Sequence, residues 1–159
     1  MSDEQYLTEA IVEATAALKN GGLPIGAVMV KDEEIIARGR SGVFSSNDAT
    51  AHAEIECIRA TGQVMGTHDL TGCILYSTLE PCSMCLGAAA WAHLEAVIFG
   101  AHQRDVPSNP YELVDYDAER TAPRLRTPHG TGLEIRGDVL RTECTALMQP
   151  IVNWSRVSG

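Results

Sequence analysis

The chain has 159 residues, of which 45% are hydrophobic and 21% charged, as in an ordinary globular protein. This length fits one domain, residues 1–159, with a core around a single sheet. A formal net charge of −9 disfavours nucleic acid as a partner, because an acidic surface repels phosphate groups. No apolar run approaches the ~20 residues of a membrane-spanning helix, and the acidic start lacks the pattern of a secretory signal peptide. We therefore expect a cytoplasmic protein with no membrane partner, whose five cysteines stay reduced.

The first part of the chain predicts a β-hairpin between two helices. Apolar side chains first recur at helical spacing until a pair of glycines. Two apolar segments joined by an acidic turn follow, which is typical of a hairpin. A stretch rich in Ser, Gly, Asn and Asp then predicts a loop before the next helix. The expected elements are a helix over residues 3–20, strands over 25–30 and 34–38, a loop over 41–50 and a helix over about 51–61.

In the second part, segments of strand and helix length alternate. Pro81 suits a helix start, where its missing N–H costs nothing. The alternation predicts an α/β fold in which helices cover both faces of a mainly parallel sheet, made mixed by the hairpin. The expected elements are a strand over residues 73–78, a helix over 82–92, a strand over 96–100, loop with room for a short helix over 102–131, a strand over 133–136 and a closing helix over 139–152.

Two cysteines and a histidine have the chemistry of a metal site. Cys82 and Cys85 are three residues apart, so their sulfurs share one face of a helix. In the first turn, free N–H groups and the helix dipole favour thiolates. Soft sulfur together with the imidazole of His52 selects zinc. Structural zinc sites are normally closed by four protein ligands, so three ligands predict an open, catalytic site.

Glu54 suits the role of proton carrier beside that open position. Residues two apart inside a helix point in nearly opposite directions, so we expect His52 to stand at the very start of its helix, turned toward the metal. Zinc lowers the pKa of a bound water to about 7. A carboxylate beside that water accepts its proton and passes it to a ring nitrogen and a leaving amine. This chemistry needs an electron-poor carbon that carries an amino group, as in cytosine, guanine or adenine.

Three segments carry a family resemblance: residues 24–28, 47–54 and 75–88. The pattern of His-x-Glu followed by Pro-Cys-x-x-Cys, here His52 to Glu54 and 81–85, is that of zinc base deaminases. The chain resembles the cytidine-deaminase-like superfamily from about residue 5 to about 101, in the branch of guanine, fungal-type cytosine and tRNA adenosine deaminases. The resemblance implies a three-layer α/β/α sandwich with a mixed five-stranded sheet, a zinc ion, a homodimer, and a variable segment, 102–159, that acts as a lid.

The resemblance also bears on the substrate contacts. Relatives bind the base through an Asn eleven positions before the zinc histidine, where this chain has Ser41, so Asn47 is an alternative. The tail offers further polar groups, among them Asn109, Tyr111 and Tyr116, and a flat ring, Trp154, to cover the base. The expected substrate-binding residues are Ser41, Asn47, Ala53, Glu80, Asp115, Asp117 and Trp154.

Three functions remain open on these residues. The first is deamination of a small heterocycle, a free base of the guanine or cytosine type, by a hydrolase acting on cyclic amidines. The second is deamination of adenosine in tRNA, against which the net charge of −9 argues. The third is a non-catalytic, zinc-stabilised subunit, which would have no need of Glu54 beside an open coordination position.

Overall fold

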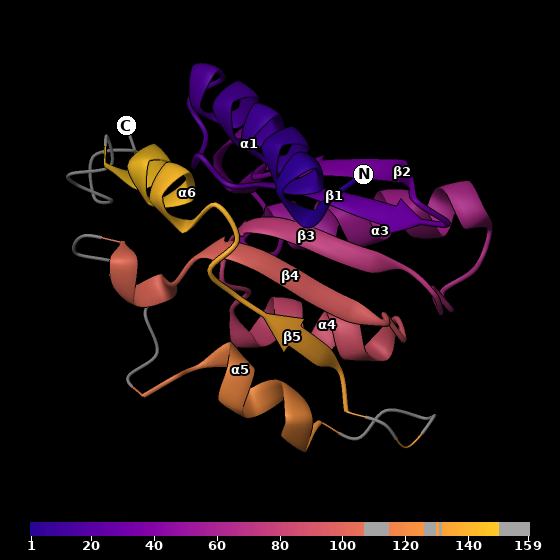
Figure 1. Cartoon of the computed structure of the whole chain (residues 1–159). Helices are drawn as coiled ribbons and strands as arrows, with labels where there is room; N and C mark the ends of the chain where they lie inside the picture. Colours follow the sequence, from indigo (N-terminus) through magenta and orange to yellow (C-terminus); the bar gives the residue numbers. More distant parts are fainter. Residues whose placement is uncertain (107–114, 126–129, 131, 150–159) are drawn as a thin grey trace.

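The computed structural model describes residues 1–106, 115–125, 130 and 132–149 (Figure 1). Its helices and strands follow the expected order. They are α1 (Asp3–Lys19), β1 (Gly26–Lys31), β2 (Glu34–Arg40), α2 (Val43–Ser46), α3 (Ala53–Met65), β3 (Ile74–Leu79), α4 (Ser83–Trp91), β4 (Ala96–Ala101), the 3₁₀ turn η1 (Gln103–Asp105), α5 (Ala118–Thr121), the 3₁₀ turn η2 (Ala122–Arg124), β5 (Glu134–Arg136) and α6 (Arg141–Met148).

Within the described residues the sheet has five strands in the order β2-β1-β3-β4-β5. The predicted mixed sheet is confirmed: β2, β3, β4 and β5 run in one direction and β1, in the hairpin, runs against them. β1 runs antiparallel to both of its neighbours, β2 and β3, whereas β4 runs parallel to both β3 and β5. The connection through α3 does bring β3 parallel to β2, but β1 lies between them and pairs with each. The hairpin therefore separates two strands that sequence alternation treats as neighbours.

Two hydrophobic cores lie on the two faces of the sheet, which confirms the three-layer α/β/α sandwich. Successive residues of a strand point to opposite faces, and in β1 Val28 faces one core while Met29 faces the other. The core under α1 and α6 contains Leu7, Ala10, Val28, Tyr76, Ile98 and Met148. The core under α3 and α4 contains Met29, Cys57, Leu75, Leu86 and Val97. Figure 1 shows α1 and α6 on one side of the sheet, with α3 and α4 behind it.

Local signals explain where the element boundaries differ from expectation. α3 continues four residues beyond the predicted end and stops where Gly66 takes a left-handed φ of 68°, which glycine adopts without strain. The expected loop over 41–50 contains the short helix α2, where the hydroxyls of Ser45 and Ser46 donate to the Gly42 carbonyl. The short helix foreseen in 102–131 is α5. Of the predicted closing helix, 150–152 lies outside the described residues. In the described part of the chain, no helix is long and apolar enough to cross a bilayer.

Gly39 lets α3 pack directly on β2. A Cβ atom at this position would overlap the Ala53 carbonyl oxygen and lie 2.6 Å from the Cys57 amide nitrogen. Both are backbone atoms of α3, so they move only if the helix moves. The absence of a side chain at residue 39 thus sets the distance between the edge strand and the helix that begins beside His52.

We predict that Gly39→Ala lowers the free energy of unfolding by ~1–3 kcal/mol, the usual cost of overpacking a core. Gly87→Ala is the matched control, because a Cβ there meets nothing within 4 Å and lies on a helix. The control should leave stability unchanged or raise it by up to ~1 kcal/mol. Urea unfolding of the two variants measures both, and equal stabilities would contradict the packing argument.

Candidate active site

His52 stands where the sequence predicts, immediately before α3. It is the N-cap residue, with extended dihedrals of φ −69° and ψ 153°, and its side chain makes no capping hydrogen bond. Asp48 shapes the approach, because its Oδ1 atom accepts hydrogen bonds from the Thr50 amide at 2.8 Å and the Thr50 hydroxyl at 2.7 Å. This Asx turn brings the chain to His52 in an extended conformation. The imidazole is therefore turned away from the helix axis.

Cys82 occupies the equivalent position in α4. It is the N-cap residue, with φ −68° and ψ 171°, and its side chain also makes no capping bond. The helix begins at Ser83, so Pro81 precedes the N-cap rather than opening the helix as expected. Cys85 is buried in the first turn, on the side that faces Cys82. Both sulfurs lie at the amino end of α4, where backbone N–H groups stabilise negative charge.

The three ligand atoms fit one tetrahedral zinc ion. The two sulfurs lie 3.6 Å apart, and His52 Nδ1 lies 3.6 Å from Cys82 Sγ and 3.5 Å from Cys85 Sγ. Tetrahedral zinc with ordinary bond lengths to sulfur and nitrogen places its sulfurs ~3.8 Å apart and each sulfur ~3.6 Å from the nitrogen. The donor set is the soft combination that zinc prefers. The residues present therefore fit the ion in both chemistry and spacing.

Hydrogen bonding within the cluster separates the pKa values of the two thiols. The bond between the sulfurs lowers the pKa of Cys82 to about 4, with a further contribution from His52. The same bond raises the pKa of Cys85, and the bond to Cys82 raises the pKa of His52. The cluster thus favours the thiolate form of Cys82, and metal binding displaces the remaining protons.

Glu54 lies in the first turn of α3 beside this cluster. Its side chain is 3% exposed, and the Ser77 hydroxyl on β3 donates to its Oε1 atom at 3.3 Å. Burial raises the pKa of Glu54 to about 7, and the charge of Cys82 adds to this effect. After the bond to Cys82 and burial, the charge of Glu54 contributes to the raised pKa of Cys85, as expected for a carboxylate near the metal ligands. Ser77 was not among the expected site residues, since no motif marks it.

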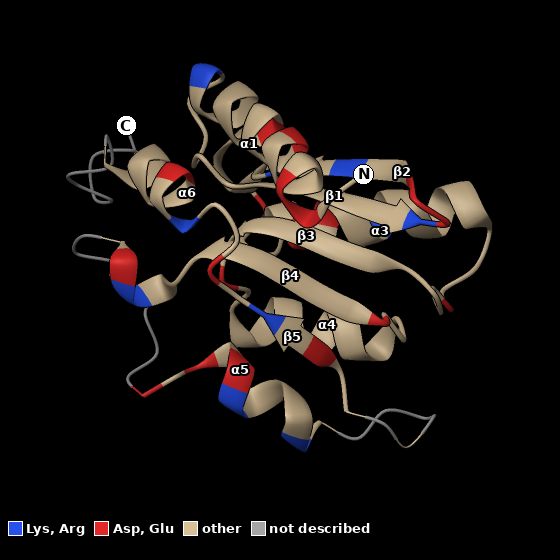
Figure 2. Ribbon diagram, viewed as in Figure 1, with Lys and Arg blue, Asp and Glu red and all other residues tan. Residues whose placement is uncertain are grey.

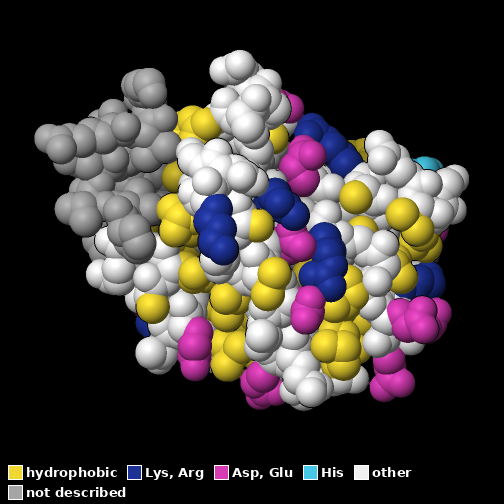
Figure 3. Space-filling model, turned by 90° about the horizontal axis from the view of Figure 1, so that it is seen from above, with side chains coloured by type: hydrophobic (Ala, Val, Ile, Leu, Met, Phe, Trp, Pro, Cys, Tyr) yellow, Lys and Arg dark blue, Asp and Glu magenta, His cyan; other side chains and the backbone are white. Residues whose placement is uncertain are grey.

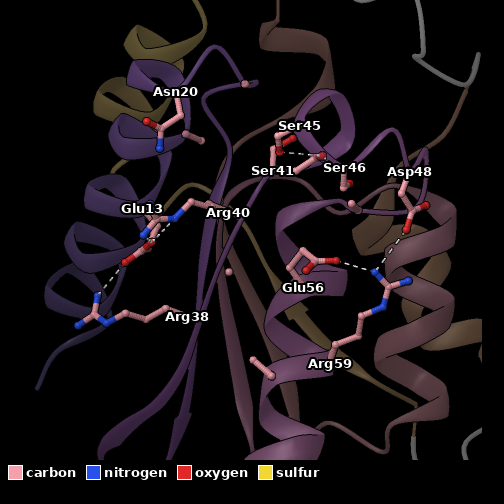
Figure 4. Close-up of a pocket in the computed structure, with 16 residues that line it drawn as sticks. Glu13, Asn20, Arg38, Arg40, Ser41, Ser45, Ser46, Asp48, Glu56 and Arg59 are labelled. Atoms are coloured by element: carbon pink, nitrogen blue, oxygen red, sulfur yellow. Dashed lines mark hydrogen bonds and ion pairs between the residues drawn. The ribbon is translucent and has the colours of Figure 1, made fainter.

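The structure places Ser41 in a hollow at the sheet edge, whereas Asn47 does not line it. Ser41 is buried and lines a pocket between α1, β2, α2 and α3. Figure 4 shows that this pocket also holds two groups of ion-paired side chains, Glu13 with Arg38 and Arg40, and Arg59 with Asp48 and Glu56. Neither Glu54 nor a zinc ligand lines it. Asn47 is exposed and ends α2 in a left-handed conformation with φ 52°.

The remaining expected contacts are distributed differently. Ala53 is the first residue of α3, next to His52 and Glu54, and its N–H has no acceptor within the helix. Glu80 is 3% exposed and accepts hydrogen bonds from the backbone amides of Gln103 and Ala118. Asp117 caps α5 by accepting from the Arg120 amide at 3.0 Å, and Asp115 is exposed. Trp154, like Asn109 and Tyr111, lies outside the described residues.

The fold and site together define a zinc-dependent deaminase. Residues 1–101 match the family model described as the cytidine and deoxycytidylate deaminase zinc-binding region, and the chain belongs to this family. Its activity class is therefore that of a deaminase hydrolase, and His52, Cys82 and Cys85 form the zinc-binding site typical of the family. The resemblance drawn from the sequence motifs is confirmed.

Individual relatives divide between two activities. Guanine deaminase of Bacillus subtilis (strain 168) is 44% identical over 131 residues, which cover 77% of this chain and 84% of that protein. A tRNA-specific adenosine deaminase of Buchnera aphidicola subsp. Schizaphis graminum (strain Sg) is 34% identical over 147 residues, which cover 92% of this chain and 91% of that protein. A structure from a study of A-to-I editing by tRNA:A34 deaminases matches with a TM-score of 0.75 at 31% identity, covering 90% of this chain and 98% of that chain.

We predict that Cys82→Ala abolishes stoichiometric zinc binding, because two ligands do not hold the ion against water. Cys144→Ala is the matched control, since Cys144 is a buried thiol among apolar residues of the other core. Elemental analysis after dialysis should find about one zinc per chain in the wild type and control. Full zinc content in Cys82→Ala would contradict the assignment of this ligand.

Proposed function

We propose that the protein hydrolytically deaminates a free aminated heterocycle, a nucleobase of the guanine or cytosine type, and releases ammonia. The observation that carries this proposal is the buried Glu54 carboxylate beside a cluster to which the described residues contribute three protein ligands. A structural zinc site uses a fourth protein ligand and has no need of a neighbouring buried acid. This arrangement disfavours a non-catalytic, zinc-stabilised subunit.

The residues of the site divide the chemistry between them. When bound, zinc supplies a Lewis acid that makes water a nucleophile at neutral pH. Glu54 takes a proton from the attacking water and delivers protons to the ring nitrogen and the leaving amine. A new C–O bond forms at the amino-bearing carbon, the C–N bond breaks, and the products are the oxo base and ammonia. Ser77 fixes the carboxylate through its hydrogen bond to Oε1, so each proton transfer starts from a defined position.

Surface charge supports a small base over tRNA as the substrate. Five arginines across the described chain form ion pairs with carboxylates: Arg38, Arg40, Arg59, Arg136 and Arg141. Figure 2 shows basic residues scattered over several elements with acidic residues on the same or adjacent ones, and Figure 3 shows the two kinds interleaved on the face seen from above. Paired arginines on a chain of net charge −9 make a poor surface for a phosphate backbone.

The second candidate is deamination of adenosine in tRNA. Its support is the extent of the match, since the Buchnera relative and the structure from the tRNA:A34 study each align with at least 90% of this chain. We rank it below the free base because of the charge distribution. For either substrate we propose that the protein is a homodimer and that residues 102–159 cover the pocket.

We predict that Glu54→Gln retains zinc and fold but loses at least ~10²-fold in kcat, the usual contribution of a positioned acid–base group. Glu56→Gln is the matched control, because Glu56 lies two residues along the same helix and pairs with Arg59 at the edge pocket. Steady-state rates of ammonia release measure kcat for both variants, and metal analysis measures their zinc content. Near-normal turnover by Glu54→Gln would refute the role of this residue.

We also predict which substrate releases ammonia. Guanine or cytosine should be converted with rates that barely depend on salt, because a neutral base makes no phosphate contacts. The panel contains guanine, cytosine, adenine, the matching nucleosides and transcribed tRNA, each assayed at low and high salt. Conversion of tRNA alone, falling steeply with salt, would establish the second candidate instead. A zinc-loaded protein that converts none of them would support the non-catalytic subunit.

A further inference from the structure

The two residues before the first zinc cysteine are held by segments far along the chain. Glu80 is almost fully buried between β3 and Cys82. Its Oε1 atom accepts from the Ala118 amide at 2.7 Å and its Oε2 atom from the Gln103 amide at 2.9 Å. Its own backbone carbonyl accepts from the Gln103 side-chain amide at 2.8 Å. Both carboxylate oxygens of Glu80 thus accept hydrogen bonds from backbone amides of later segments, so the side chain stabilises the fold rather than facing a ligand.

Tyr116 completes these contacts one residue nearer to the metal. Its hydroxyl donates to the Pro81 carbonyl at 2.8 Å, so it bonds the peptide group that leads into Cys82. The charges of Cys82 and Cys85 contribute to the raised pKa of the Tyr116 phenol, after the larger effect of burial, which agrees with its place beside the zinc ligands. Tyr116 therefore binds Pro81, and Ala118 binds Glu80. We call this pair of neighbouring contacts the latch.

The latch extends away from the metal through His102. This buried histidine lies 3.6 Å from Glu80 Oε2 through Nδ1 and 3.0 Å from Asp138 Oδ1 through Nε2. Asp138 in turn pairs with Arg141 at the start of α6. Residues 80–82, which we call the zinc loop, are thus connected through Glu80 to the segment before α6 as well as to α5. A buried carboxylate with this many partners resists displacement, because each lost partner leaves a desolvated polar group.

We propose that Glu80 and Tyr116 are positioning residues for the zinc site, which hold Cys82 in its extended N-cap conformation and bind the tail segment 116–118 to the metal loop. Neither side chain is a zinc ligand. Each fixes the backbone that aims the Cys82 sulfur, in the way that groups around metal ligands commonly raise metal affinity. Because binding linkage is reciprocal, a bound zinc ion also stabilises the latch. The proposal rests on the zinc site and not on which substrate is deaminated.

The first test compares two tyrosines with the same hydrogen bond. Tyr116→Phe removes the hydroxyl that bonds Pro81, and the control Tyr6→Phe removes a hydroxyl that donates to the Glu33 carbonyl at 2.8 Å in the other core. We expect Tyr116→Phe to release zinc to a colorimetric chelator about tenfold faster than wild type, the low end for such groups, and Tyr6→Phe to match wild type. The cobalt-substituted proteins, whose visible absorption reports ligand geometry, should differ from wild type only for Tyr116→Phe.

The second test removes one carboxylate acceptor. Glu80→Gln places an amide NH₂ against one of two backbone N–H groups. The control Glu119→Gln also removes a charge but keeps an oxygen to accept from the Gly137 amide, which donates to Glu119 at 3.0 Å. We expect zinc release to accelerate ~10–100-fold for Glu80→Gln and to stay unchanged for Glu119→Gln. Glu80→Asp, which keeps both acceptors, should recover part of the loss. If Glu80→Gln does not fold, the tyrosine pair still decides the question. Equal zinc release and equal cobalt spectra for Tyr116→Phe and Tyr6→Phe would overturn the proposal.

Discussion

The site depends on extended backbone at two helix N-caps. Inside a helix His52 and Glu54 would diverge, and they converge on one metal site because His52 stands outside the first turn of α3. Cys82 meets Cys85 in the same way at the start of α4. N-cap side chains usually bond the helix amides, and losing such a cap costs ~1 kcal/mol. Here neither N-cap side chain makes that bond, so both are directed to the metal, and the energy of metal binding offsets the lost caps.

Sheet topology brings the two N-caps together. β2, β3 and β4 all run in the same direction, because β1 is antiparallel to β2 and β3 while β4 is parallel to β3. Their carboxyl ends therefore lie at one edge of the sheet, where ligands of α/β proteins are usually bound. The loop that ends at His52 follows β2, Cys82 follows β3, and His102 follows β4. The inserted strand β1 supplies no chemistry, but it sets the distance between the first two of these loops.

The parts of this arrangement that are local in sequence were predictable. A His-x-Glu and a Cys-x-x-Cys pattern at helix starts identify the ligands, the metal and the orientation of His52, because N-cap geometry depends on neighbouring residues. The two cores follow from alternation within strands. Glu80 was expected to contact substrate, since its neighbours are motif residues, whereas its described partners lie 23 and 38 positions away. Contacts between residues so far apart in the sequence produce no periodic pattern that sequence analysis could detect. The position of Ser41 in a hollow without zinc ligands depends likewise on how α1 and α3 pack beside the edge strand.

The match to the family model ends at residue 101, and the partners of the zinc loop lie beyond it, at Gln103, Tyr116 and Ala118. The shared region thus contains a buried carboxylate, Glu80, whose two oxygens accept from backbone amides of the segment outside that region. An unsatisfied buried carboxylate is costly. The backbone positions of residues 103 and 116–118 are therefore constrained by their contacts with residues 80 and 81. The segment that follows the shared region is then anchored near its start to the backbone that leads into the zinc ligand Cys82.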